Sequence, residues 1–332
     1  MRHILYLPLI SFAFFACRKN NDISVPNNSP ALSFDSLKSI TSNIPNAVYS
    51  DLTFINETTG YAITKGFIVK TTDGGSKWTS ITLPISTPLK KIQFTDSQTG
   101  YIIGGDNTFG VLLKTTDGGQ NWIVINLNAL ESPYGMFFVN NNIGFITGKN
   151  LFIKTINGGQ TWTSLKSNGF RMFQDISFRN NNEGYATSNN GVYFKTTNGG
   201  ISWDSLRYNT TNYLYDIYFT ENKTLIRQGW GSDTLVDFEN NYAVTKISPI
   251  AVKLLFFNQQ KCIGIGLHYE NPFNYYPNGD ILITNDGWKT ISQKTFITTD
   301  AINFTAVAKM SENKAMILGV NLSGTKVLIL NR

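Results

Sequence analysis

Hydrophobic and polar residues along this chain alternate in short runs that predict β-strands. Near residue 50, the apolar run Leu52-Thr53-Phe54 is followed by a polar turn that ends in Gly60-Tyr61, and the run Phe67-Ile68-Val69-Lys70 leads into a second turn. Short runs rich in β-branched and aromatic residues, separated by Gly, Asn and Asp, are typical of antiparallel sheets. The pair of glycine and aromatic residue returns at Gly100-Tyr101, Gly144-Phe145 and Gly184-Tyr185. The pattern therefore predicts a repeated unit of antiparallel strands.

A short motif occupies the second turn of each unit. The first copy reads Thr71-Thr72-Asp73-Gly74-Gly75-Ser76-Lys77-Trp78, and later copies contain Asp117 and Trp122, Asn157 and Trp162, and Asn198 and Trp203. The four tryptophans are 44, 40 and 41 residues apart. A period of this length with four strands per unit is typical of propeller blades. Asp or Asn can fix such a turn, glycine can take positive φ and Trp can pack on a neighbouring blade, so the motif predicts structure rather than catalysis.

The count of units extends to seven. Asp286-Gly287-Trp288 fits the motif with Trp288 at the second glycine and Ile291 at the tryptophan, and a degraded copy fits residues 237–242. Three further strand patterns end at Val327-Leu328-Ile329-Leu330, and Phe34-Asp35-Ser36-Leu37 is the candidate for the missing fourth strand. We therefore expect an all-β protein over residues 32–332. We expect its architecture to be a seven-bladed β-propeller of four-stranded antiparallel blades, whose N-terminal strand closes the last blade and removes its open edge.

The motif Thr/Ser-x-Asp-x-Gly-x-x-Trp is the Asp-box, or BNR repeat. Its form here, with Lys70 before the first copy and Gly60-Tyr61 in the preceding turn, resembles the photosystem II stability/assembly factor-like propellers over about residues 32–332. The resemblance implies that Asp-boxes lie at the blade periphery, so Asp73, Asp117 and Asp286 have structural roles. Asp-boxes also occur in sialidases, xyloglucan-type glycosidases and sortilin-like receptors, and fold and function are therefore separate questions.

The first residues predict an export signal. Arg2 and His3 precede an apolar stretch, residues 4–15, that is too short to span a bilayer. Residues 14–17, Phe-Phe-Ala-Cys, resemble a bacterial lipobox, with ordinary cleavage after Ala16 as the alternative. We expect a signal peptide at 1–16, lipidation of Cys17 and a polar tether over 17–31. Because no acidic run follows Cys17, we expect an outer-membrane lipoprotein that faces the periplasm.

The composition of the chain argues against several classes of functional site. The net charge is +6, charged residues make up 15% of the chain and no Lys/Arg block is present, which argues against nucleic-acid binding. After removal of the signal, His268 is the one histidine and Cys262 the one cysteine besides Cys17. Six residues apart on one strand, they would be separated by about 20 Å. These counts argue against metal sites, Ser-His-Asp triads and intrachain disulfides, and we expect no cofactor.

One set of charged residues suggests a possible catalytic site. Aligning the innermost strands places Asp51, Lys91, Gly135, Asp175, Asp216 and Lys253 in one column, three residues before a phenylalanine. In a propeller this column should surround one mouth of the central channel. Asp175, Asp216 and Asp51 could act in glycoside hydrolysis if one of them had a raised pKa. The alternative is a solvated, charge-balanced channel mouth without catalytic activity.

The longest departure from the repeat is an aromatic-rich insertion, residues 268–279, between strands two and three of the sixth unit. Long loops on a rigid scaffold often bind partners, and Tyr and Trp are enriched where proteins meet. With two blade connections and Trp230, the candidate interaction surface comprises Phe170, Arg171, Arg207, Tyr208, Trp230, His268, Tyr269, Phe273, Tyr275 and Tyr276. The alternative is a decoration whose aromatic rings pack on their own propeller.

Three functional hypotheses follow. We expect a non-enzymatic, monomeric platform that is anchored to the envelope by its lipid. The assembly-factor resemblance implies that it binds a protein during assembly or maintenance of a complex. The alternative is a glycan-binding or glycan-cleaving surface propeller that uses the carboxylates of the channel mouth. A purely structural surface module is the third. A sialidase is disfavoured because none of the few arginines lies in that family's Arg-Ile-Pro context.

Overall fold

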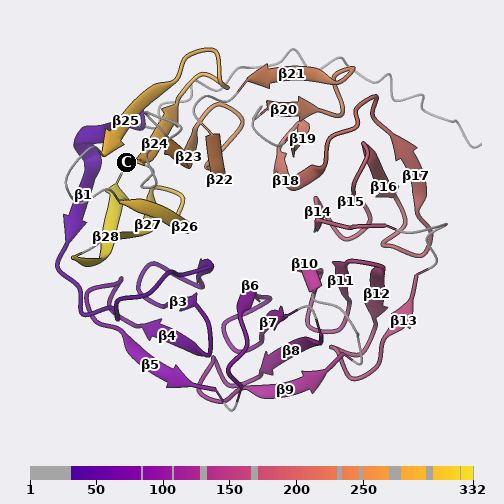
Figure 1. The fold of residues 1–332 in the computed structure, drawn as a ribbon, viewed down its shortest axis with the longest axis horizontal. Helices are drawn as coiled ribbons and strands as arrows, with labels where there is room; N and C mark the ends of the chain where they lie inside the picture. The colour runs from indigo at the N-terminus through magenta and orange to yellow at the C-terminus, as the bar shows by residue number, and fades with distance from the viewer. Residues whose placement is uncertain are drawn as a thin grey trace, which may run out of the picture. The chain divides into compact units, whose positions relative to one another are not determined.

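The computed structural model describes residues 31–83, 85–106, 108–127, 133–165, 171–229, 234–246, 250–268, 278–296, 302–321 and 323–331. Residues 31–332 form one compact unit. Its described residues build seven four-stranded antiparallel sheets, which Figure 1 shows arranged as blades around a central axis. This confirms the predicted seven-bladed β-propeller. In the part of the chain that is described, no helix has the length and hydropathy of a membrane span.

Each of the first six blades is a meander of four consecutive strands. Blade 1 comprises β2 (Asp51–Phe54), β3 (Gly60–Ile63), β4 (Phe67–Thr71) and β5 (Thr79–Thr82), and blade 2 comprises β6 (Leu89–Phe94), β7 (Gly100–Gly105), β8 (Gly110–Thr115) and β9 (Ile123–Asn126). Blade 3 comprises β10 (Pro133–Phe138), β11 (Gly144–Gly148), β12 (Leu151–Thr155) and β13 (Thr163–Ser164), and blade 4 comprises β14 (Asp175–Phe178), β15 (Gly184–Thr187), β16 (Val192–Thr196) and β17 (Asp204–Arg207).

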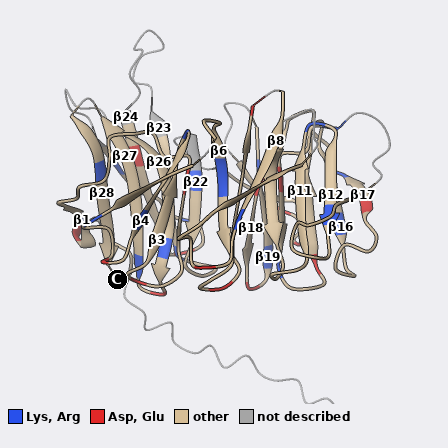
Figure 2. Cartoon of the chain, turned by 90° about the horizontal axis from the view of Figure 1, so that it is seen from below, with Lys and Arg blue, Asp and Glu red and all other residues tan. Residues whose placement is uncertain are grey.

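The second half of the ring follows the same order. Blade 5 comprises β18 (Leu214–Thr220), β19 (Lys223–Gln228), β20 (Thr234–Asp237) and β21 (Ala243–Lys246), and blade 6 comprises β22 (Ile250–Phe256), β23 (Cys262–His268), β24 (Asn278–Thr284) and β25 (Ser292–Phe296). Blade 7 combines β26 (Asn303–Ser311), β27 (Lys314–Asn321) and β28 (Gly324–Asn331) with β1 (Leu37–Ile40). Seen from the side, the strands run between the two faces of the ring, and turns connect them at its edges (Figure 2).

The N-terminal strand closes the ring, as expected, but three residues later than the sequence suggested. Phe34–Ser36 form a short 3-10 helix, in which the Ser36 hydroxyl donates a hydrogen bond to the Ser33 carbonyl at 2.8 Å. Strand β1 begins at Leu37, which pairs with Leu330 of the last strand. The shift arises because the chain first contacts blade 6: the Asn285 side chain bonds both the N–H (2.7 Å) and the C=O (2.9 Å) of Leu32.

Aromatic side chains fill the seams between blades. Tyr61 of blade 1 stacks on Phe94 of blade 2 at a centroid distance of 4.5 Å, and Phe145 of blade 3 stacks on Phe178 of blade 4 at 4.8 Å. The glycines before Tyr61 and Phe145 are required by packing within the blade, since a Cβ on Gly60 would lie 2.6 Å from the Phe54 ring and one on Gly144 would lie 2.4 Å from the Phe138 ring. The repeated glycine-aromatic pair is therefore the signature of a seam.

The Asp-box turns have the geometry that their residues favour. In blade 1 the Thr71 hydroxyl donates to Asp73 at 3.0 Å and accepts the Gly75 N–H at 2.9 Å, while the Trp78 indole N–H donates to the Gly75 carbonyl at 2.8 Å. Gly75 has φ of 97°. In blade 6 Trp288 takes the second glycine's place with φ of 74°. Its backbone N–H donates to the Thr284 hydroxyl at 3.0 Å, so the hydrogen bond made by glycine in the other copies is also made by tryptophan at this position.

Candidate binding site at the channel mouth

The charged column predicted from the innermost strands meets at one mouth of the channel. A cavity of about 330 Å³ is lined there by Ser50, Asp51, Lys90, Lys91, Tyr134, Asp175, Asp216, Ile217, Tyr218, Lys253, Leu254 and Val307. The column residues reach it because they stand near the beginnings of the innermost strands β2, β6, β14, β18 and β22, which lie nearest the axis (Figure 1). The structure thus brings together all three candidate carboxylates, Asp51, Asp175 and Asp216.

Each of these carboxylates is paired with a cation. Asp175 forms an ion pair with Lys91, and Asp51 lies 3.2 Å from the Lys253 ammonium. Asp216 accepts a hydrogen bond from Nε of Arg227 at 2.8 Å and forms an ion pair with Nη2 of the same guanidinium at 2.8 Å. Arg227 stands on β19 and was not among the residues that the sequence suggested. An alignment of the second strands of the blades would point to it, as the alignment of the first strands points to the carboxylates.

Two of the carboxylates also bind the backbone of the next blade. Asp51 accepts the Ile92 N–H at 3.0 Å, and Asp175 accepts the Ile217 N–H at 3.3 Å. Asp175 is buried, with 6% of its surface exposed, so the alternative of a solvated, charge-balanced mouth does not describe the surroundings of this carboxylate. Its backbone approaches blade 3 so closely that the column residue there, Gly135, has no room for a side chain: a Cβ would lie 2.9 Å from the Asp175 Cα.

Burial and neighbouring charges act in opposite directions on this pair. Burial raises the pKa of Asp175, the contact with Lys91 lowers it and the charge of Asp216 raises it again, with a net rise. Burial lowers the pKa of Lys91, but the carboxylates of Asp175, Asp216 and Asp51 outweigh that effect and raise it overall. A raised carboxyl pKa is one requirement of a glycosidase acid. An ammonium in direct contact with it is typical of a structural ion pair.

Cations also lie over tyrosine rings around the mouth. The Lys90 ammonium is 4.5 Å from the centroid of Tyr134, and the Arg227 guanidinium is 4.8 Å from that of Tyr215. Tyr213 stacks beside Tyr215 at 6.0 Å. Such contacts orient both the cation and the ring. The mouth therefore offers aromatic surface and charges of both signs on rigid strands, which suits recognition of a polar ligand or an extended protein segment.

The residues of the predicted interaction surface are only partly described. Phe170, Trp230, Tyr269, Phe273, Tyr275 and Tyr276 lie outside the described residues, as does Cys17, and for His268 the backbone alone is described, at the end of β23. Arg207 is exposed on β17. The backbone of Arg171 bonds Asn150 in the turn of blade 3, with the Asn150 N–H donating to its carbonyl at 2.8 Å. Tyr208 contacts the rings of Phe238 (5.8 Å) and Tyr242 (5.2 Å) in blade 5.

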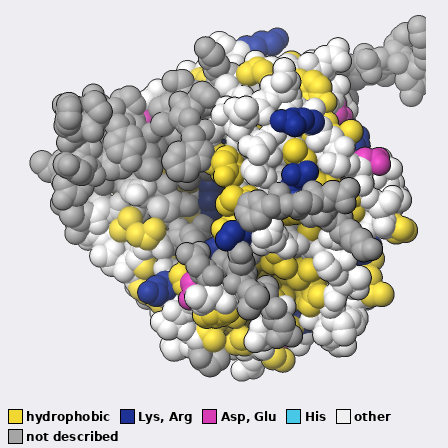
Figure 3. All heavy atoms as spheres, turned by 45° about the vertical axis from the view of Figure 1, so that its right-hand side comes forward, with side chains coloured by type: hydrophobic (Ala, Val, Ile, Leu, Met, Phe, Trp, Pro, Cys, Tyr) yellow, Lys and Arg dark blue, Asp and Glu magenta, His cyan; other side chains and the backbone are white. Residues whose placement is uncertain are grey.

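A second cavity of about 430 Å³ lies among the turns between the first two strands of blades 5 and 6. It is lined by Arg179, Phe219, Thr220, Glu221, Phe256, Phe257, Asn258 and Gln259. On the surface shown in Figure 3, Lys and Arg side chains appear as separate points among hydrophobic and uncharged polar groups. Among the described residues, no three His, Cys, Asp or Glu side chains are grouped so as to hold a metal ion.

Comparison with known proteins identifies the family. The model of the family described as photosynthesis system II assembly factor YCF48 matches residues 30–131, 76–170 and 124–213, which together span more than half of the chain. No curated protein matches the chain.

Three solved structures illustrate the likeness. YCF48 bound to D1 peptide has a TM-score of 0.69 at 20% identity and covers 91% of this chain and 99% of its own. YCF48 from Cyanidioschyzon merolae has a TM-score of 0.65 at 16% identity, with 89% and 98% covered. The GH74 enzyme of Niastella koreensis has a TM-score of 0.62 at 14% identity, with 85% and 53% covered. These structures show a shared fold, and the family match shows that this chain belongs to the family of the photosynthesis system II assembly factor YCF48.

Proposed function

We propose that this protein is a lipid-anchored, non-enzymatic propeller of the cell envelope that binds a segment of a protein partner and supports assembly or maintenance of a membrane complex. Family membership supports the assembly role. A propeller of similar structure, with nearly its whole length covered, has been solved with a bound peptide, the D1 peptide. The partner of the present protein is proposed to be a protein segment that docks at the channel mouth.

The observation that most favours binding over catalysis is the pairing of all three mouth carboxylates. Asp51, Asp175 and Asp216 each contact a lysine or arginine, and two of them also hold backbone N–H groups of the next blade. A glycosidase needs one carboxyl that can donate a proton and a second that can attack or activate water. Side chains already engaged in this way form instead a preorganised surface, which lowers the entropic cost of binding.

The test of the binding function is site-specific photocrosslinking in intact cells. A photoreactive phenylalanine analogue at Tyr134 would report on the mouth, and one at Ile201, which is 80% exposed on an Asp-box turn, is the matched control. We expect one membrane-complex protein to be captured from position 134 and not from 201. Capture of the same proteins from both positions, or of none, would contradict binding at the mouth. Deletion of 270–277 in the same cells tests whether the aromatic insertion contributes.

The lipid anchor rests on the sequence at Cys17 and has its own test. Replacing Cys17 with Ala removes the acceptor of the lipid, and a single change at the N-terminus leaves residues 31–332 intact. We expect the variant to leave the membrane fraction while the propeller remains folded. Retention in the membrane fraction, followed by extraction with high salt, would show that protein contacts rather than a lipid hold it there.

A glycan ligand is the second candidate function. The raised pKa of the buried Asp175, close to Asp216, favours it. The glycan function would be established if the protein releases reducing sugar from an envelope polysaccharide and the Asp175→Asn variant does not. The melting temperature of the variant should be unchanged. If neither Asp175→Asn nor Asp216→Asn alters the release or binding of any polysaccharide tested, the glycan function is refuted.

A further inference from the structure

Two of the ion pairs at the channel mouth connect blades that are not neighbours. Lys91 of blade 2 reaches past blade 3 to Asp175 of blade 4. Lys253 of blade 6 reaches past blade 7 to Asp51 of blade 1. At the matching position blade 3 has Gly135, and from blade 7 the cavity is lined by Val307. Each long cation can therefore cross the edge of the blade between the two partners.

The two blades that are crossed differ in how the chain builds them. Blade 3 is one continuous meander, β10 to β13. Blade 7 is assembled from both parts of the chain, because β1 pairs with β28 beside β27 and β26. Figure 1 shows this junction, where indigo β1 lies next to yellow β28. At the outer edge β1 and β28 are joined by four residue pairs, from Leu37 with Leu330 to Ile40 with Val327. Thr325 of β28 also bonds the backbone of Pro45 and Ala47, which follow β1.

The contacts of Lys253 place it at the inner edge of the same junction. Its ammonium donates to the Ser50 carbonyl at 2.6 Å and to Asp51 Oδ1 at 3.2 Å. Asp51 Oδ2 in turn accepts the N–H of Ile92 in blade 2. The side chains of Lys253 and Asp51 are 29% and 19% exposed, so both groups are largely shielded from water. Charge-assisted hydrogen bonds in such surroundings are stronger than exposed ion pairs.

We propose that Lys253 is a second closure of the propeller: an inner clasp that holds blades 6 and 1 around the composite blade 7, independently of the pairing between β1 and β28. A ring made of one chain can open where its ends meet, and every other seam lies within continuous chain. The clasp acts at that junction, near the channel axis, whereas β1 acts at the rim. Lys91 and Asp175 have the same geometry but cross a blade that cannot separate, so they should contribute nothing to closure.

The matched pair Lys253→Met and Lys91→Met tests this proposal by hydrogen exchange of the purified full chain. Each variant removes one ammonium and keeps the length and apolar stem of the side chain. We expect Lys253→Met to raise the exchange rates of amides in β1 and β28 by about tenfold through more frequent local opening. Lys91→Met should leave those rates unchanged, with any effect confined to blades 2 to 4. Lys253→Arg, which retains the charge, should exchange in β1 and β28 as the original protein does.

Two outcomes would overturn the inner clasp. One is an unchanged exchange rate in β1 and β28 of Lys253→Met. The other is an equal increase in both methionine variants, which would indicate a general loosening of the mouth. Should Lys253→Met fail to fold, Asp51→Asn, which keeps the Lys253 bond to the Ser50 carbonyl, provides a milder version of the same comparison. In that case a rise in β1 and β28 exchange of about threefold supports the clasp, and none refutes it.

Discussion

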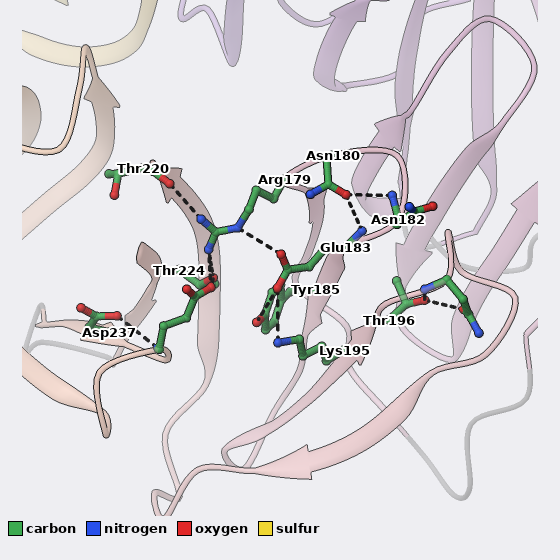
Figure 4. A network of polar contacts seen from close by, with 12 residues as sticks. Arg179, Asn180, Asn182, Glu183, Tyr185, Lys195, Thr196, Thr220, Thr224 and Asp237 are labelled. Carbon is green, nitrogen blue, oxygen red and sulfur yellow. Dashed lines mark hydrogen bonds and ion pairs between the residues drawn. The ribbon is translucent and has the colours of Figure 1, made fainter. Parts of the chain in front are cut away.

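Arg179 of blade 4 forms an ion pair with Glu239 in a turn of blade 5. Figure 4 shows Arg179 between Thr220 of blade 5 and Glu183 of its own blade. The same guanidinium donates to the carbonyls of Thr220 at 3.0 Å and Glu221 at 3.2 Å. Earlier seams use another device: Lys154, for example, donates to the Asp-box carbonyl of Gly199 in the next blade at 3.1 Å. The degraded motif of blade 5 has no glycine pair. Blades 4 and 5 are connected instead by the charged side chains of Arg179 and Glu239.

Removing the Arg179 guanidinium should therefore destabilise this seam more than removing a lysine elsewhere. Arg179→Gln removes the cation that contacts both Glu239 and Glu183, and hydrogen bonds of charged groups contribute about 1.5–3 kcal/mol. We expect a loss of about 2 kcal/mol in the free energy of unfolding by urea. Lys154→Met is the control and should cost less, since its ammonium contacts the carbonyls of Gly199 and Gly200 and its removal separates no ion pair described for this seam. Equal losses would contradict a special role of this ion pair.

Acid should weaken the Asp-box of blade 2. Hydrogen bonds from the backbone and side chain of Asn121, and then from Thr115, lower the pKa of Asp117 to about 2, below the value of about 4 for an unfolded chain. A lowered folded-state pKa means that the stabilisation is complete above about pH 4 and is lost as pH falls through about 2. Asp117→Asn should retain the turn, as Asn157 and Asn198 do in blades 3 and 4. Its melting temperature should fall less between pH 5 and pH 2 than that of the original protein, and parallel curves would contradict the assignment.

Trp288 combines a left-handed backbone with a buried side chain, and two substitutions separate these effects. Its φ is 74° and 8% of its surface is exposed. Trp288→Ala should cost roughly 3–5 kcal/mol, because it removes a large buried side chain and keeps the strained backbone. Trp288→Gly should be more stable than Trp288→Ala by about 1 kcal/mol, because glycine adopts positive φ without strain. Urea unfolding measures both, and a glycine variant no more stable than the alanine variant would argue against the left-handed conformation.

Gly135 should not tolerate a side chain. A Cβ there would lie 2.4 Å from the Thr147 hydroxyl and 2.9 Å from the Asp175 Cα, so blades 3 and 4 would have to move apart. We expect Gly135→Ala to destabilise the protein by about 1–3 kcal/mol in thermal or urea unfolding. Gly264→Ala in blade 6 is the control, because its nearest neighbour is the flexible end of the Leu254 side chain at 3.1 Å. If both variants have the same stability, the close approach at the mouth is not required.

The blades themselves could be deduced from residues a few positions apart. The alternation of apolar and polar residues specifies strands, and Thr71, Asp73 and Gly75 complete their turn through bonds that span at most four residues. Trp288 also could be assigned to the second glycine position of its motif from the sequence alone, because the turn is defined by residues close in sequence. Counting such units yields seven blades, and a seven-bladed ring needs a fourth strand for the last one. That strand begins at Leu37, three residues later than the pattern predicts, and the contact just before it, between Leu32 and Asn285, joins residues 253 positions apart.

Which charged residues of different blades form ion pairs depends on the closed ring and cannot be seen in the sequence. The sequence column grouped Asp51, Asp175 and Asp216 but gave no means of assigning Lys91 to Asp175, 84 residues away, or Lys253 to Asp51, 202 residues away. Arg227 lies beside Asp216 because its strand, β19, pairs with β18 in the antiparallel direction. Local hydrogen bonds and hydrophobic periodicity act over a few residues and can be seen in the sequence. Ion pairs across a channel depend on the radius and closure of the whole ring, which only the folded chain defines.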